Sequence, residues 1–133
     1  MDHAMRVLVV DDDSAVRASL SAYLEDEGFV LRSTGSAPQA LSIIAGEPID
    51  VAIVDIRLGE MDGQNLILSA RQLQPGTKFL VYTGSIAYQL PNALMCIGMQ
   101  QRDVMYKPVP TMRVVADEIR RLAGKECDDV RQQ

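Results

Sequence analysis

The chain has 133 residues, of which 47% are hydrophobic and 23% charged, so we expect a single domain with a substantial hydrophobic core. Its net charge of -5 excludes the basic footprint of a nucleic-acid-binding domain, and no apolar run approaches the roughly 20 residues of a membrane span. The amino terminus has no signal-peptide pattern, and Cys96 and Cys127 lack the spacing of a metal site or a disulfide framework. We therefore expect a reduced, cytoplasmic protein.

Short apolar runs alternate with amphipathic helical patterns along the chain. In chain order we expect strand Arg6–Asp11, helix Ser14–Glu27, strand Phe29–Ser33, helix Ala37–Ala45, strand Val51–Asp55, helix Gly63–Leu73, strand Lys78–Thr83, a helix from near Pro91 to Gly98, strand Asp103–Lys107 and helix Thr111–Ala123. Residues 1–124 would then form the domain. The polar segment 125–133 is expected to be a frayed tail or the start of a linker.

Caps and apolar stripes support the first and last of these helices. Asp13 or Ser14 is expected to cap the first helix and Gly28 to follow its end, while Gly124 is expected to end the last helix. Pro91 suits the first position of the fourth helix. The residues expected to face inward are Val16, Leu20, Tyr23 and Leu24 in the first helix and Val114, Val115, Ile119 and Leu122 in the last.

Fully apolar strands separated by helices are typical of a parallel sheet that is covered on both faces. We therefore predict an α/β fold, with a doubly wound parallel sheet of five strands. The carboxyl ends of all the strands then open on one edge of the sheet, where proteins of this architecture bind their ligands.

Asp11 and Asp12 follow the first strand at that edge. Adjacent carboxylates repel each other unless a cation lies between them, and Mg²⁺ is a cation that takes one or two carboxylates and keeps several waters. The alternative is that these residues only cap the next helix and place favourable charge at its amino terminus. Asp13 fits the role of cap better than that of metal ligand.

Asp55 closes the third strand, where a lone carboxylate is costly unless it has a partner. Aspartate carboxylates can act as nucleophiles that form aspartyl-phosphates, although a solvated aspartate at a strand end is the simpler alternative. Thr83 and Lys107 end the fourth and fifth strands. The hydroxyl of Thr83 and the ammonium of Lys107 suit two oxygens of a phosphoryl group. Pro108 ends the fifth strand abruptly, because proline has a fixed φ and no backbone N–H. The Lys107–Pro108 peptide bond is of the X–Pro type, which tolerates the cis form.

Four stretches of the chain together resemble the receiver domain of two-component response regulators. They are VLVVDDD at Val7–Asp13, VAIVDIRLGEMDG at Val51–Gly63, YTG at Tyr82–Gly84 and YKP at Tyr106–Pro108. The resemblance extends from about Arg6 to Gly124. It implies a flavodoxin-like (βα)5 fold with strand order 2-1-3-4-5.

The resemblance also implies a function. Asp55 would accept a phosphoryl group from a histidine kinase or phosphotransfer protein, in a Mg²⁺-dependent reaction. Mg²⁺ would be held by Asp12, Asp55 and the backbone carbonyl of Arg57, with Asp11 acting through water. The domain would then be a signalling phosphoacceptor whose only chemistry is self-phosphorylation and autodephosphorylation.

The remaining implications concern the output of the domain. Thr83 and Lys107 would bind the phosphoryl oxygens and report phosphorylation to the rest of the domain. A homodimer through the face made of the fourth helix, the fifth strand and the fifth helix is a further expectation. We expect no contact of this segment with nucleic acid or membrane.

Three positions depart from the family pattern. Gly59 stands where family members usually have proline. The segment Ser85–Arg102 is longer than usual and carries Pro91, so we expect the fourth helix to be short or displaced. Val104 stands three residues before Lys107, where an aromatic residue is usual; the nearby aromatic is Tyr106. Valine is stiff at χ1 and too short to swing between buried and exposed positions. We therefore expect the signal to pass through Thr83 and the loop that follows it, with Tyr82, Tyr88 or Tyr106 taking the part of the missing aromatic residue.

Two other functions are compatible with parts of this pattern. A phosphohydrolase of the haloacid dehalogenase type also uses an Asp nucleophile and Mg²⁺, and Asp11 and Asp13 fit its D-x-D motif. Its further acidic ligands would have to come from Asp117, Glu118, Asp128 and Asp129, which are not at a strand end. A receiver-like module that binds partners without phosphorylation is disfavoured because all the expected site residues are present.

Overall fold

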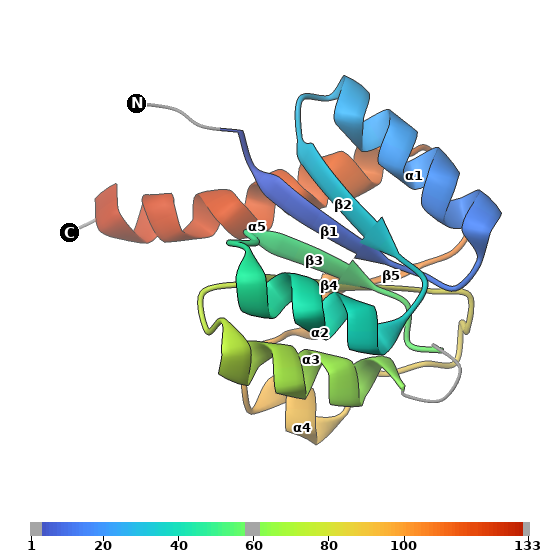
Figure 1. Cartoon of the computed structure of the whole chain (residues 1–133). Helices are drawn as coiled ribbons and strands as arrows, with labels where there is room; N and C mark the ends of the chain where they lie inside the picture. The colour runs from blue at the N-terminus through green and yellow to red at the C-terminus, as the bar shows by residue number, and fades with distance from the viewer. Residues whose placement is uncertain (1–3, 58–61, 132–133) are drawn as a thin grey trace.

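The computed structural model describes residues 4–57 and 62–131, in which strands and helices alternate (Figure 1). The elements are β1 (Arg6–Val10), α1 (Ser14–Asp26), β2 (Val30–Thr34), α2 (Ala37–Gly46), β3 (Val51–Val54), α3 (Gly63–Leu73), β4 (Lys78–Thr83), α4 (Asn92–Met95), the 3-10 helix η1 (Gln101–Asp103), β5 (Val104–Tyr106) and α5 (Arg113–Arg131). None of the described helices is both long and apolar enough to cross a membrane.

The five strands form one parallel sheet with the order β2-β1-β3-β4-β5. This is the predicted flavodoxin-like order. The register pairs Val10 with Val54 at the ends of β1 and β3, and Thr83 with Tyr106 at the ends of β4 and β5. The residues that follow these pairs are therefore neighbours at one edge of the sheet, as the sequence predicted.

Helices cover both faces of the sheet, α1 and α5 on one and α2, α3 and α4 on the other (Figure 1). Alternate residues of the central strands enter the two cores: in β1, Leu8 and Val10 pack with α2 and α3, while Val7 and Val9 pack with α1 and α5. This alternation follows from the period of two along a strand. It explains why the central strands are apolar at every position.

Helix α5 differs from its prediction in two ways. Val114 is 37% exposed, because the buried stripe is Val115, Ala116, Ile119 and Leu122, whose helical spacing leaves Val114 on the outer side. The helix also continues past Gly124 to Arg131. Gly124 does not have the positive φ of a helix-ending glycine, whereas Gly28, just after α1, has φ +99° and confirms its predicted role.

The fourth helix is short, as the long segment Ser85–Arg102 with Pro91 predicted, but its bounds differ from those expected. It has only four residues, and Pro91 is the residue before the helix rather than its first residue. The Pro91 carbonyl accepts the backbone amides of Leu94 (3.0 Å) and Met95 (3.1 Å), so proline serves here as an acceptor. Gly98 does follow the helix, with φ +100°. The Lys107–Pro108 peptide bond is cis.

Candidate functional site

The turn between β1 and α1 presents three consecutive aspartates with different surroundings. Asp11 is buried, and its carboxylate accepts hydrogen bonds from the Asp13 amide (3.0 Å) and from Lys107 Nζ (2.7 Å). The Asp13 carboxylate accepts two backbone amides of the first turn of α1, which confirms it as the cap. Asp12 is exposed, and its side chain forms no hydrogen bond or ion pair with any residue in the described ranges.

Asp55 lies just beyond β3 and is 8% exposed. Its backbone amide donates to the Val10 carbonyl (2.9 Å), which fixes it beside the end of β1. Its carboxylate accepts the Arg57 amide (3.2 Å) and Lys107 Nζ (3.2 Å). Gly63, the first residue of α3, packs against this backbone so closely that a Cβ there would lie 2.7 Å from the Asp55 carbonyl oxygen.

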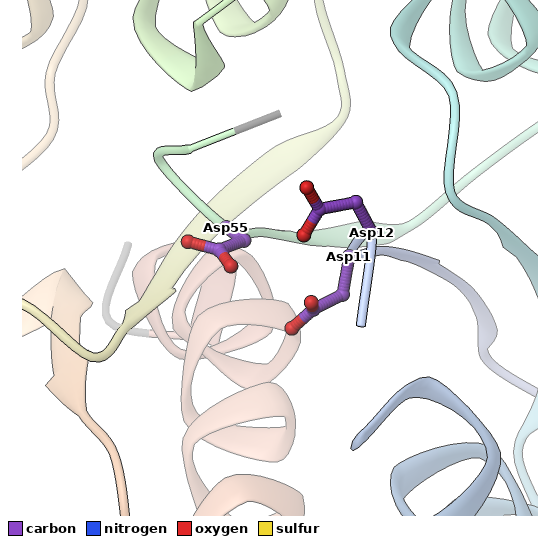
Figure 2. Close-up of side chains that lie close together, drawn as sticks. All are labelled: Asp11, Asp12 and Asp55. Atoms are coloured by element: carbon purple, nitrogen blue, oxygen red, sulfur yellow. The ribbon is translucent and has the colours of Figure 1, made fainter. Parts of the chain in front are cut away.

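Asp11, Asp12 and Asp55 bring their carboxylates together at the carboxyl edge of the sheet. One oxygen from each lies within 4.8 Å of the others. Figure 2 shows the three side chains lying close together, Asp11 and Asp12 after β1 and Asp55 after β3. Carboxylate oxygens are hard ligands, and Asp12 is exposed to solvent. Such a site suits a cation that keeps part of its water shell. The donor set therefore fits Mg²⁺.

Lys107 is the positive charge of this site. Its ammonium contacts Asp11 and Asp55 and lies 5.2 Å from the centre of the Tyr82 ring. Burial alone would lower the pKa of Lys107, but the hydrogen bond and charge of Asp11, followed by those of Asp55, raise that pKa above its ordinary value. Lys107 is therefore protonated at neutral pH.

Thr83 lies beside Lys107, because the Lys107 amide donates to the Thr83 carbonyl (2.7 Å). The Thr83 side chain is buried, and its hydroxyl oxygen accepts the Ser85 amide (3.2 Å). The backbone amide of Arg57 donates to the Asp55 carboxylate. The Arg57 carbonyl accepts no hydrogen bond from the residues that the structure describes. Gly59 lies outside the described residues.

Hydrogen bonds that were not predicted from the sequence join the loop after β4 to η1 and β5. The Tyr106 hydroxyl donates to the Tyr88 carbonyl (2.6 Å) and accepts from the Gln101 side chain (2.9 Å). The Gln101 side-chain oxygen accepts the Leu90 amide (3.0 Å). Val104 is buried and only 7% exposed. Tyr106 and Tyr88 were among the tyrosines that the sequence indicated as replacements for the missing aromatic residue, and the bond from the Tyr106 hydroxyl to the Tyr88 carbonyl joins them.

A family model described as the response regulator receiver domain matches residues 7–118 of the chain. The chain belongs to this family. As a receiver domain it is a signalling protein rather than a classical enzyme, and receiver domains act with histidine kinases or phosphotransfer proteins. The comparisons give no support to the phosphohydrolase alternative.

Similar proteins agree with this assignment. The alginate biosynthesis transcriptional regulatory protein AlgB of Pseudomonas aeruginosa is 32% identical over 123 residues, covering 92% of this receiver domain and 26% of AlgB. The putative response regulator NtrX-like of Rickettsia bellii is 30% identical over 129 residues, covering 92% of this chain and 27% of its own. The chain thus spans about a quarter of these relatives.

A solved structure shows the same fold. The response regulator receiver domain protein (CheY-like) of Methanospirillum hungatei JF-1 is 30% identical and superposes with a TM-score of 0.81, covering 95% of this chain and 99% of its own. The fold and family of this receiver domain are therefore established from both sequence and structure.

Proposed function

We propose that Asp55 accepts a phosphoryl group from the phosphohistidine of a histidine kinase or phosphotransfer protein. A carboxylate oxygen of Asp55 forms the new O–P bond as the N–P bond of the donor breaks, and the departing imidazole takes up a proton. The observation that carries this proposal is the contact of one lysine, Lys107, with both Asp11 and Asp55 at the carboxyl edge of the sheet. Such an arrangement holds charge-stabilising groups where the transferred phosphoryl group would lie.

Mg²⁺ would be held by Asp12, Asp55 and the backbone carbonyl of Arg57, with Asp11 contributing through water. When bound, the cation supplies positive charge that offsets the negative charge of the phosphoryl oxygens. Lys107 forms ion pairs with the carboxylates of Asp11 and Asp55, at 2.7 Å and 3.2 Å. The same site would support self-phosphorylation from small phosphodonors and slow autodephosphorylation.

The acceptor residue can be identified directly. The protein is incubated with Mg²⁺ and acetyl phosphate, the acyl phosphate is trapped with borohydride, and the modified residue is mapped by mass spectrometry. We expect one adduct, on Asp55. An adduct on Asp11, Asp12 or any other residue would refute the assignment of Asp55 as acceptor.

Lys107→Ala is expected to slow phosphorylation by about 10²-fold, the usual cost of removing one charge-stabilising donor from a reacting group. The protein should stay folded, because the contacts that are lost lie at the edge of the sheet rather than in either core. The rate of adduct formation with acetyl phosphate is the measurement. Lys78→Ala, at the opposite end of β4, is the control and should react like the wild type. A wild-type rate in Lys107→Ala would make Lys107 a structural residue only.

We propose that the switch works through the loop after β4. Thr83 would move toward the phosphoryl group and pull Gly84–Gln89, and the hydrogen bonds that join Tyr106 and Gln101 to this loop would carry the movement to β5. Val104 is buried and short, so it is not the moving part. A phosphoryl group shifts such an element only through contacts that differ between its two states.

The largest amide chemical shift changes on adding beryllofluoride, which mimics the phosphoryl group, are expected in residues 83–91. Val104→Ala should keep this response, because its side chain does not move. Tyr106→Phe removes the hydroxyl that joins β5 to the loop, so shift changes beyond the loop should decrease. A Val104→Ala protein without any distant response would show instead that the usual switch position operates here.

A homodimer through α4, β5 and α5 also remains a proposal. Met95 on α4 and Val114 on α5 are 47% and 37% exposed, which gives this face apolar side chains to bury.

A further inference from the structure

The side chain of Arg17, the fourth residue of α1, lies against the aspartate turn. Its Nη1 donates a hydrogen bond to the backbone carbonyl of Asp11 at 2.5 Å. The sequence analysis did not find this contact, because an arginine on the polar side of a helix is usually solvated. The bond spans six residues and connects α1 to the peptide that joins Asp11 to Asp12.

Every polar group of Asp11 has a partner in the structure. Its amide donates to the Thr34 carbonyl (3.1 Å), and its two carboxylate oxygens accept the Asp13 amide and Lys107 Nζ. Arg17 is the partner of the remaining group, the carbonyl. Because Asp11 is only 2% exposed, water cannot easily replace the guanidinium. Arg17 therefore fixes the plane of the peptide from which Asp12 extends.

Gly35, just after β2, makes room for the guanidinium. A Cβ on Gly35 would lie 2.8 Å from Arg17 Nη1 and 3.5 Å from the Asp11 carbonyl oxygen. The described glycines with positive φ are Gly28 and Gly98, so Gly35 has a backbone that other residues can adopt. What the position requires is space, and the space is filled by Arg17. A methyl group there would displace a flexible side-chain end rather than the backbone.

We propose that Arg17 is a positioning residue for the metal site, and that Gly35 is its necessary partner. By holding the Asp11–Asp12 peptide, Arg17 aims the Asp12 carboxylate, which has no other described contact to hold it, toward Asp11 and Asp55. This inference rests on the proposed Mg²⁺ site. Removing a group that does not touch the metal but orients one of its ligands typically weakens metal binding by 10- to 100-fold.

The test is a double-mutant cycle on Mg²⁺ affinity, measured by titration calorimetry in the absence of phosphodonor. Arg17→Ala and Gly35→Ala should each weaken Mg²⁺ binding by about tenfold. The double variant should be no weaker than either single variant, because both changes remove the same contact. Arg102→Ala and Gly46→Ala are the matched controls: Arg102 is exposed, and a Cβ on Gly46 would meet nothing within 4 Å. Both controls should bind Mg²⁺ like the wild type.

A second readout separates positioning from a general effect on the fold. The ¹⁵N shift of the Asp12 amide reports the orientation of the Asp11–Asp12 peptide, and it should change in the same way in Arg17→Ala and Gly35→Ala before any metal is added. Arg17→Lys retains a donor and should recover part of the affinity. Unchanged Mg²⁺ affinity in Arg17→Ala, or losses that add in the double variant, would overturn the inference while leaving the metal site in place. A wild-type protein that binds no Mg²⁺ would overturn the proposed site itself.

Discussion

Asp12→Ala is expected to abolish Mg²⁺ binding and to leave the metal-free protein folded and at least as stable as the wild type. Asp12 contributes an exposed carboxylate to a group of three, and Lys107 pairs only with the other two. Removing one of two like charges at about 4 Å in water relieves roughly 1 kcal/mol of repulsion. Asp12→Ala also removes the proposed metal ligand that is most exposed to solvent, where a hydrated cation would bind.

Titration calorimetry measures the affinity for Mg²⁺, and thermal unfolding without metal measures the stability. Asp13→Ala is the matched control one residue away. It removes the cap of α1, so it should cost about 1 kcal/mol of stability and keep Mg²⁺ binding. The two neighbouring substitutions should therefore have opposite effects on the two measurements. Unchanged Mg²⁺ affinity in Asp12→Ala would contradict the proposed site.

Asp55→Asn is expected to remove phosphorylation completely. Asparagine has nearly the same shape and can still accept the Arg57 amide, so the turn after β3 should be kept. It has no anionic oxygen to attack phosphorus, and Lys107 keeps its partner Asp11. Loss of the adduct would then reflect chemistry rather than unfolding.

The measurement is the intact mass of the protein after incubation with acetyl phosphate and Mg²⁺. Asp26→Asn, on the exposed side of α1, is the control and should be phosphorylated like the wild type. A phosphorylated species that persists in Asp55→Asn would place the acceptor elsewhere in the chain.

The central strands β1 and β3 were predictable from sequence because a strand of a parallel sheet that is covered on both faces needs apolar residues at nearly every position. The apolar runs Val7–Val10 and Val51–Val54 therefore end at the same residues as their strands. The candidate site residues Asp11 and Asp55 follow directly. Parallel pairing then placed Asp11 next to Asp55 without further information. The sequence did not predict that Lys107 contacts both carboxylates, because the resemblance implied a role for it only toward the phosphoryl oxygens.

Features that depend on packing between distant segments were not predictable. A hydrophobic pattern did not distinguish the buried Val115 from the exposed Val114, because the outcome depends on how α5 is rotated against the sheet. Gly124 resembled a helix end in the sequence, but a glycine ends a helix only when the backbone turns there. The guanidinium of Arg17 packs against Gly35, where a Cβ would leave too little space for it. Nothing in the sequence around either residue indicates that the two lie close together.

Three carboxylates lie together at the edge of the sheet, and the ammonium of Lys107 pairs with only two of them, Asp11 and Asp55. In the proposed mechanism this excess of negative charge would repel an incoming phosphoryl group, and a bound cation would reduce that repulsion. By thermodynamic reciprocity, the phosphoryl group must strengthen cation binding by the same factor. The domain would then respond to the free magnesium concentration as well as to its kinase, and would act as a coincidence detector for both.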